Sequence, residues 1–158
     1  MSEVTDIATA KIMSFADWML PQILELAREM HRESAPHRDM TLDEPKILAQ
    51  VKSSNPDVFF RAVVRGPEVL GGFFGAITET AFFVEKGARE LLWFIRKSRR
   101  GSMAAVMLVR DFEAWATARG ARTFFLSQST AVEIEQTRRL YEKLGYLVCG
   151  VNTFKKVA

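Results

Sequence analysis

Near the middle of the chain, four basic side chains stand directly before a segment of mostly small residues: Arg96, Lys97, Arg99 and Arg100. The start of a helix exposes about four unpaired N–H groups and roughly half a positive charge, so a basic loop that leads into a helix attracts anions. The residues that would form this helix start are Gly101, Ser102, Met103, Ala104 and Ala105. The small side chains among them would let a bulky diphosphate approach the main chain. The stretch therefore predicts a phosphate-binding site.

Neither of the common nucleotide-binding motifs explains this stretch. The sequence lacks the P-loop pattern G-x-x-x-x-G-K-S/T and the dinucleotide fingerprint G-x-G-x-x-G. A solvated basic loop that only keeps the protein soluble is the alternative interpretation. The helix-forming segment that follows at once favours the anion site over that alternative.

The composition is that of one soluble domain, which we expect to span residues 1–158. Of the 158 residues, 48% are hydrophobic and 26% are charged, as in ordinary globular proteins. No apolar run approaches the roughly 20 residues of a membrane-spanning helix, and the N-terminus lacks the layout of a secretory signal. We therefore expect a cytoplasmic protein without a membrane partner. A net charge of +3 is too small to indicate nucleic-acid binding by itself.

The first half of the chain predicts a strand, two helices and a β-hairpin. Residues 4–12 form the expected strand, and a capping-box spacing, Ser-x-x-Asp at 14–17, opens a helix that runs to about residue 33. The same kind of spacing, Thr-x-x-Glu at 41–44, opens a shorter helix. Residues 58–78, rich in β-branched and aromatic side chains around a Gly-Pro turn, predict the hairpin.

The second half alternates strands and helices, which makes the whole a mixed α/β domain. The expected strands are a short one at 81–84, a central one covered on both faces at 90–95, another at 122–127, and one or two closing strands within 146–157. The expected helices are one at 102–119, ended by Gly120, and one that is capped by Thr130 with Glu133 and ended by Gly145. The single cysteine, Cys149, stands among apolar residues and is expected to be a buried core thiol.

Two segments of this second half resemble a known family. Residues 100–105 follow the loop pattern R/Q-x-x-G-x-G/A, with Met103 where glycine is usual, and residues 140–146 read LYEKLGY without a gap. These residues resemble the GNAT superfamily of N-acetyltransferases, in which this loop and the next helix bind the pyrophosphate of acetyl-coenzyme A. The order of elements before residue 90 also agrees with that family. Among its members, the chain looks most like compact bacterial and bacteriophage acetyltransferases.

The resemblance implies an α/β (mixed α+β) fold: a twisted, mostly antiparallel sheet of six or seven strands, flanked by about four helices. Acetyl-coenzyme A would bind as cosubstrate where two central parallel strands splay apart, with no metal. Backbone N–H groups near Phe94 and Ile95 would stabilise the oxyanion. The resemblance implies a set of cofactor-binding residues that runs from this strand end into the helix start: Phe94, Ile95, Arg96, Arg99, Arg100, Gly101, Ser102, Met103, Ala104 and Ala105.

Transfer of an acetyl group from a thioester to an amine needs a base for the amine and a proton for the departing thiolate. Tyr141 matches the position of the family's general-acid tyrosine, and we expect it to supply that proton. Glu90 is our candidate for the base, and Glu79 is a further candidate. Taken without its context, each of the two glutamates is better explained as a solvated carboxylate at a strand end.

Residues 31–39, HRESAPHRD, correspond to a segment that borders the acceptor site in the family. The resemblance therefore makes four of its side chains candidates for substrate contacts: His31, Glu33, His37 and Asp39. Two histidines six residues apart, without a cysteine partner, do not have zinc-site spacing, so we predict no metal here.

Three functions follow from this interpretation. The first is an N-acetyltransferase that moves an acetyl group from acetyl-coenzyme A to a primary amine, by direct attack without an acyl-enzyme. The second is a protein of the same fold that binds coenzyme A or a protein partner without catalysis. The third, nucleic-acid binding through residues 96–100, lacks the aromatic side chains interleaved with arginines that such a surface uses. We expect a monomer or a homodimer.

Overall fold

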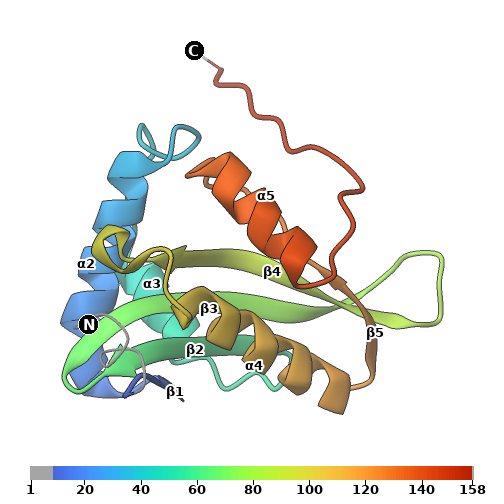
Figure 1. Ribbon diagram of the computed structural model, residues 1–158, viewed down its shortest axis with the longest axis horizontal. Helices are drawn as coiled ribbons and strands as arrows, with labels where there is room; N and C mark the ends of the chain where they lie inside the picture. The colour runs from blue at the N-terminus through green and yellow to red at the C-terminus, as the bar shows by residue number, and fades with distance from the viewer. Residues whose placement is uncertain (1–8, 158) are drawn as a thin grey trace.

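The fold is a five-stranded sheet with helices on both faces (Figure 1). The computed structural model describes residues 9–157. In spatial order the strands are β1 (Lys11–Met13), β2 (Val58–Arg65), β3 (Glu68–Glu79), β4 (Lys86–Ile95) and β5 (Ala121–Phe125). The first four strands pair antiparallel, and β4 and β5 pair parallel. The sheet is thus mostly antiparallel, with one parallel pair at its C-terminal edge.

Two hydrophobic clusters hold helices against opposite faces of the sheet. The helices are α2 (Leu20–Glu33), α3 (Glu44–Val51), α4 (Ala104–Ala118) and α5 (Ile134–Lys143), with short 3-10 turns η1 (Asp17–Met19) and η2 (Lys97–Arg99). Because side chains alternate along a strand, β2 sends Phe59 to one face and Phe60 to the other. The Phe59 cluster holds α4, and the Phe60 cluster holds α2 and α3. None of the helices within residues 9–157 has the length and apolar character needed to cross a membrane.

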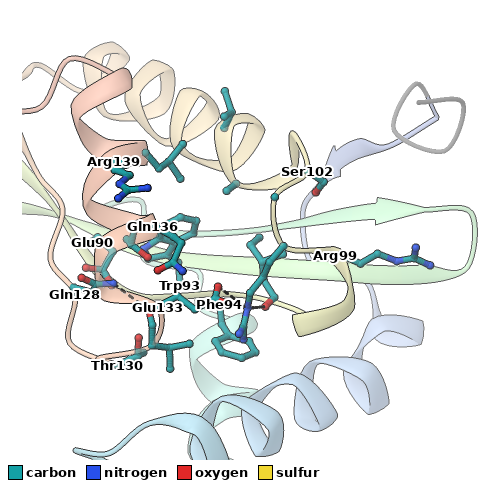
Figure 2. Close-up of a pocket in the computed structure, with 18 of the residues that line it drawn as sticks. Glu90, Trp93, Phe94, Arg99, Ser102, Gln128, Thr130, Glu133, Gln136 and Arg139 are labelled. Carbon is teal, nitrogen blue, oxygen red and sulfur yellow. Dashed lines mark hydrogen bonds and ion pairs between the residues drawn. The ribbon is translucent and has the colours of Figure 1, made fainter. Parts of the chain in front are cut away.

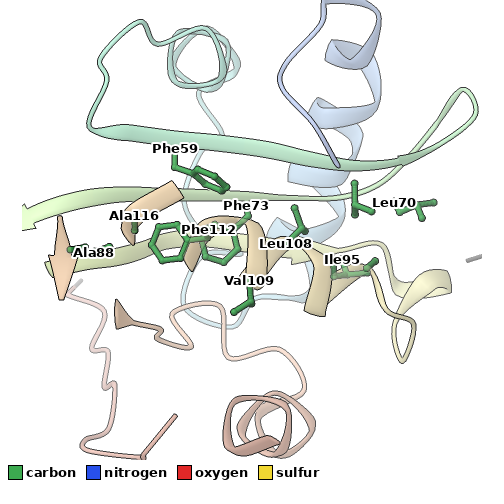
Figure 3. Close-up of a cluster of buried hydrophobic side chains, with 12 residues drawn as sticks. Phe59, Leu70, Phe73, Ala88, Ile95, Leu108, Val109, Phe112 and Ala116 are labelled. Carbon is green, nitrogen blue, oxygen red and sulfur yellow. The ribbon is translucent and has the colours of Figure 1, made fainter. Parts of the chain in front are cut away.

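Aromatic packing fixes α4 on the sheet (Figure 3). Phe112 of α4 lies with its ring centroid 5.4 Å from that of Phe59 and 4.8 Å from that of Phe73. Gly75 of β3 makes this close approach possible, since a Cβ atom there would lie 2.4 Å from the Phe112 ring. Because the N-terminus of α4 follows the basic loop directly, this packing also fixes where that loop stands relative to β4.

Most of the predicted elements are confirmed, but the starts of the first two long helices differ from the prediction, as does the start of α5 described below. The first long helix does end at Glu33, yet its approach is η1, whose N-cap Ala16 makes no side-chain hydrogen bond. At α3 the cap is Asp43, which accepts from the N–H of Lys46, so the Thr41 spacing was the wrong one. Of the predicted strand at 4–12, residues 11–12 fall in β1 and residues 4–8 lie outside the described residues.

The sheet has five strands within the described residues, rather than six or seven, because neither the short strand predicted at 81–84 nor any closing strand predicted within 146–157 forms. Residues 81–84 follow the last β3–β4 pair, Glu79 with Lys86, so they make the exposed turn of the hairpin instead of a strand. Residues 146–157 carry strand-forming side chains but find no pairing strand, and β propensity without a partner is not sufficient. Cys149 lies in this segment and is exposed, so the prediction of a buried thiol was wrong.

Candidate active site

A cavity of about 470 Å³ opens where β4 and β5 separate (Figure 2). The two parallel strands pair only from Lys86 with Ala121 to Arg89 with Phe125. Beyond this point β4 continues to Ile95, while the chain after β5 turns away into a loop. The cavity is lined by the end of β4, the segment that leads into α4, the loop at residues 127–133, and one face of α5. A coenzyme was expected in a gap between two central parallel strands; within the described residues the diverging parallel pair lies at the edge of the sheet, because no strand pairs beyond β5.

Glu90 lies at the floor of the cavity and is 3% exposed. Its Oε2 accepts hydrogen bonds from the main-chain N–H of Ser127 at 3.1 Å and from the Ser127 hydroxyl at 2.6 Å. Burial raises the pKa of Glu90, and the two hydrogen bonds from Ser127 oppose that rise. The interpretation as a solvated strand-end carboxylate was therefore wrong for Glu90, because the loop after β5 folds over it. Glu79, in contrast, is exposed and lies outside the cavity.

Tyr141 lies directly behind this floor, and 8% of it is exposed. Its hydroxyl accepts from the indole N–H of Trp93 at 2.9 Å and donates to the main-chain oxygen of Ser127 at 2.8 Å. Burial and the neighbouring charge of Glu90 raise the pKa of Tyr141 above its ordinary value, so the phenol stays protonated at neutral pH. Trp93 and Ser127 line the cavity whereas Tyr141 does not, so Tyr141 contacts the site through these two residues.

At the mouth of the cavity, Arg100 joins four elements of the fold. Its guanidinium donates to both carboxylate oxygens of Glu33 at 2.7 and 3.1 Å and to the main-chain oxygen of Ile95 at 3.1 Å. It also stands 3.7 Å from a carboxylate oxygen of Glu133 and lies over the ring of Phe94. The side chain is 15% exposed, so these partners compensate a largely buried charge.

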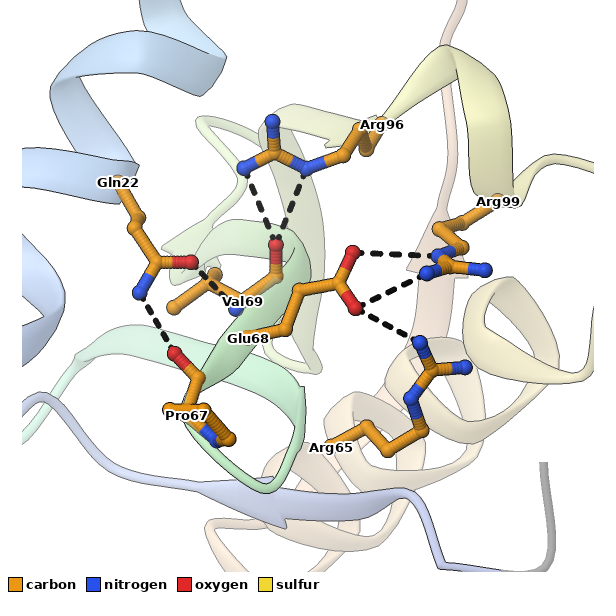
Figure 4. Close-up of polar contacts among 7 residues, drawn as sticks. All are labelled: Gln22, Arg65, Pro67, Glu68, Val69, Arg96 and Arg99. Atoms are coloured by element: carbon orange, nitrogen blue, oxygen red, sulfur yellow. Dashed lines mark hydrogen bonds and ion pairs between the residues drawn. The ribbon is translucent and has the colours of Figure 1, made fainter. Parts of the chain in front are cut away.

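The other arginines of the basic loop point elsewhere (Figure 4). Arg99 donates to both carboxylate oxygens of Glu68 at 3.2 and 3.0 Å, although it also borders the cavity. Arg96 turns toward α2, where it lies near Glu25 and Glu29 and donates to the main-chain oxygen of Val69. Arg96 and the buried Ala104 do not line the cavity, while the remaining predicted cofactor-binding residues do.

The start of α4 presents main-chain N–H groups to the same cavity. Gly101 has φ +80°, a left-handed conformation that suits glycine. Ser102 accepts from the N–H of Ala104, and α4 has no side-chain cap at Met103. Within residues 9–157, no hydrogen bond uses the main-chain N–H of Gly101, Ser102 or Met103. Together with the dipole of the 15-residue helix, these groups can bind an anion.

The predicted substrate-contact residues stand apart from the cavity, at the C-terminal end of α2. His31 bonds the main-chain oxygen of Met40 at 2.6 Å, and His37 bonds the buried Ser34 hydroxyl at 2.7 Å. Burial, with a smaller contribution from His31, lowers the pKa of His37. Asp39 pairs with Lys156, whose hydrogen bond and charge lower the pKa of Asp39. Of the predicted set only Glu33 is linked to the cavity, through Arg100.

The loop at 127–133 is a part of the site that sequence analysis missed. Ala131 and Glu133 have φ values of +54° and +48°, a conformation that costs side-chain-bearing residues free energy and often marks functional sites. Glu133 is the N-cap of α5 without a side-chain cap, so Thr130 does not cap the helix as predicted. The cavity-lining residues that carried no sequence signal include Gln128, Gln136 and Arg139, and Lys143 lies in the LYEKLGY segment but was given no role. Within the described part of the chain, no three acidic, histidine or cysteine side chains gather as a metal site requires.

A model of the acetyltransferase (GNAT) family matches residues 20–146 of this chain. The match includes the basic loop at 96–100, α4, the loop at 127–133 and α5. A search of curated protein sequences finds no match.

Solved structures with the same fold share little sequence with this chain. Glucosamine-6-phosphate N-acetyltransferase from Arabidopsis thaliana has a TM-score of 0.72 at 13% identity, covering 95% of this chain and 99% of that one. AAC(6')-Iy in complex with a bisubstrate analogue, CoA-S-monomethyl-acetylneamine, has a TM-score of 0.70 at 13% identity, with 94% and 98% covered. A transcriptional regulator from Bacillus halodurans C-125 has a TM-score of 0.74 at 16% identity, with 94% and 99% covered.

Proposed function

The chain belongs to the GNAT acetyltransferase family, and from this premise we propose that it transfers an acetyl group from acetyl-coenzyme A to a primary amine by direct attack. One observation carries the proposal. A single cavity runs from the main-chain N–H groups at the start of α4 to the buried carboxylate of Glu90. An anion site and a buried base at two ends of one cavity are what a phosphate-bearing acyl donor and an amine acceptor require.

In this proposal the coenzyme diphosphate binds at Gly101–Ala105, and the pantetheine arm follows the edge of β4 that β5 leaves unpaired. The thioester carbonyl then lies near Phe94 and Ile95, and the main-chain N–H of Ile95 stabilises the oxyanion. Because the N–H of Arg96 bonds to Leu70 of β3 and N–H directions alternate along a strand, the N–H of Phe94 points to β3 and that of Ile95 points away from it. Arg100 gives up part of its contact with Glu33 or Glu133 to the diphosphate, since the guanidinium already stands at the cavity mouth.

Glu90 is the base in this mechanism. A primary alkylamine has a pKa of about 10, so only about a thousandth of it is unprotonated at pH 7, and a base that removes the proton raises the rate. Burial raises the pKa of Glu90, which makes its carboxylate a stronger base than a solvated glutamate. Both hydrogen bonds from Ser127 reach Oε2, so Oε1 is the oxygen that takes the proton, directly or through water.

Tyr141 is the proton donor to the departing thiolate. Its phenol is protonated, buried beside the cavity wall, and held between Trp93 and Ser127. Because Tyr141 does not line the cavity, the transfer requires Trp93 or Ser127 to move aside when the coenzyme is bound, so that the hydroxyl can leave the main-chain oxygen of Ser127 and reach the sulfur. The same hydroxyl contacts the residue that orients Glu90, so acid and base are joined through Ser127.

The experiment is a thiol-release assay with acetyl-coenzyme A and a panel of primary amines, combined with calorimetry of coenzyme binding. The panel includes neamine, glucosamine 6-phosphate and a lysine peptide, because two proteins of the same fold are described with such sugars. Amine-dependent thiol release supports the proposal. The absence of any heat with millimolar acetyl-coenzyme A contradicts it.

A second candidate function is a coenzyme-binding or partner-binding protein without turnover. Arg99 and Arg100 are already paired with Glu68 and Glu33, and the hydroxyl of Tyr141 is engaged on both sides, which favours a resting or silent site. One protein of the same fold is described as a transcriptional regulator. Coenzyme binding without thiol release for any amine of the panel would select this candidate. A cytoplasmic location, a single domain, and a monomeric or homodimeric state stay predictions.

A further inference from the structure

One face of α5 carries two basic side chains into the cavity. Gln136, Arg139, Leu140 and Lys143 all line it, and their spacing of three and four residues places them on one side of the helix. Figure 2 shows Arg139 on the side of α5 that faces the cavity, near Gln136. Ala105 and Val106 of α4 also line the cavity.

These two cations differ from the other basic residues around the cavity. Arg99 and Arg100 are paired with Glu68 and Glu33, and Arg138, next in sequence, pairs with Glu135 and Glu142. The side chains of Arg139 and Lys143 make no ion pair or hydrogen bond with any residue in the described range 9–157. Two exposed, unpaired cations one turn apart in a cavity wall form a site for a multiply charged anion.

We propose that Arg139 and Lys143 bind a phosphate monoester of the coenzyme, the 3′-phosphate of its adenosine. The inference rests on the proposed function, because it takes the diphosphate to lie at the start of α4. Coenzyme A carries its 3′-phosphate on the ribose next to that diphosphate, so the second anion lies within the same cavity. The planar guanidinium of Arg139 can bind two phosphate oxygens at once, and Lys143 adds a point charge.

As a consequence, the α5 pair would let the protein distinguish coenzyme A from other diphosphates, which the start of α4 cannot do. The main-chain N–H groups at residues 101–103 recognise a diphosphate, which coenzyme A shares with dephospho-coenzyme A and with ordinary nucleotides. The α5 pair recognises the one dianion that distinguishes coenzyme A from them. A phosphate monoester that is not part of coenzyme A could bind the α5 pair in the same way. Adenosine 3′,5′-bisphosphate carries the 3′-phosphate without the pantetheine arm, so it tests whether the pair binds this phosphate when the arm is absent.

The test is calorimetry on the full chain with coenzyme A and with dephospho-coenzyme A. We expect coenzyme A to bind at least about tenfold more tightly, the ratio expected for one charge-assisted contact. Arg139→Gln and Lys143→Gln should each weaken coenzyme A several-fold and leave dephospho-coenzyme A unchanged, and the double variant should abolish the preference. Adenosine 3′,5′-bisphosphate should compete with coenzyme A for the unchanged protein but not for the double variant.

The matched control is Arg138→Gln, which removes the same charge from the same helix outside the cavity and should alter neither affinity. Equal affinity of the unchanged protein for both coenzymes overturns the inference and leaves the proposed function standing. Equal losses for both coenzymes in the Arg139 variant also overturn it, since they indicate a general charge effect. Binding of neither coenzyme overturns the proposed function as well. The comparison of ligands on the unchanged protein decides the question even if a variant fails to fold.

Discussion

The floor and the mouth of the cavity differ in the partners of their buried polar groups, which are uncharged at the floor and charged at the mouth. At the floor, Glu90 and Tyr141 are held by uncharged partners, Ser127 and Trp93, so burial shifts their pKa values upward. At the mouth, Arg100 is held by the carboxylate of Glu33, with Glu133 nearby. Burial that only neutral hydrogen bonds oppose raises the pKa values at the floor, as the proposed proton transfer requires, whereas the paired charge at the mouth is what the proposed exchange of a carboxylate for a diphosphate requires.

The largest effect is expected at the floor, from Glu90→Gln. The amide keeps an oxygen that accepts from Ser127 but cannot take a proton, so turnover should fall by about a hundredfold to ten-thousandfold. In the unchanged protein, kcat/KM should rise with pH as Glu90 ionises, at a pH above the ordinary glutamate range. The variant should lose this rise and retain coenzyme affinity by calorimetry. The control Glu79→Gln changes an exposed glutamate and should alter neither turnover nor coenzyme affinity. Equal losses of turnover in the two variants would refute the role of Glu90.

Tyr141→Phe is the second change at the floor. Turnover should fall by about a hundredfold, with coenzyme affinity retained, because a proton donor is lost. The half-buried indole N–H of Trp93 and the main-chain oxygen of Ser127 also lose a partner, which should lower the free energy of unfolding by about 1–3 kcal/mol. Urea denaturation and the thiol-release assay measure the two losses separately.

The control for Tyr141 is Tyr146→Phe. That hydroxyl donates to Glu113 of α4 and does not line the cavity, so its removal should affect stability alone. A Tyr141→Phe protein that is less stable but fully active would reduce Tyr141 to a packing role.

At the mouth, Arg100→Gln should weaken acetyl-coenzyme A by about tenfold and leave kcat within about twofold, since it removes a cation next to the diphosphate but no proton-transfer group. Initial rates at varied acetyl-coenzyme A separate KM from kcat. A fall in kcat as large as that of Glu90→Gln would mean that mouth and floor do not act separately.

Glu33→Gln should change the affinity for acetyl-coenzyme A in the opposite direction from Arg100→Gln. It removes the carboxylate that competes for Arg100, so coenzyme affinity should increase, by about threefold if one charged hydrogen bond is partly recovered. Calorimetry of acetyl-coenzyme A binding to the Glu33 and Arg100 variants, measured side by side, compares the two affinities. Weaker binding in Glu33→Gln would indicate that Glu33 positions Arg100 for the diphosphate instead of competing with it.

The smallest effect concerns stability and pH. Burial raises the pKa of Glu90 from its ordinary 4.5, so the folded protein holds this proton more tightly than the unfolded chain. The stabilisation is therefore complete below the unfolded pKa and is lost as pH rises through the folded pKa. Melting temperatures of the unchanged protein should fall relative to those of Glu90→Gln over this pH window. A constant difference between the two would contradict the raised pKa.

Local sequence patterns predicted much of the fold and one wall of the site. The apolar spacing of α4, the hairpin of β2 and β3, and the helix ends at Gly120 and Gly145 are confirmed, because each depends on neighbours within a few turns or residues. The cap at Thr130 and the strand at 81–84 failed where the surrounding chain imposed a different backbone. The cavity-lining residues Gln128 and Arg139 carried no recognisable pattern, since lining a cavity is not a local property.

The sequence by itself determined the family, through the basic loop and the LYEKLGY segment, and thereby the kind of chemistry to look for. Only the tertiary structure decided that Glu90 is buried against Ser127, 37 residues away, and that Arg100 is paired with Glu33, 67 residues away. The physical reason is that desolvation and charge pairing act through space and depend on which chain segments the packed sheet brings together. The type and spacing of a residue indicate the chemistry that it can perform. Its surroundings decide whether its pKa is shifted, as for Glu90, or its charge is paired, as for Arg100.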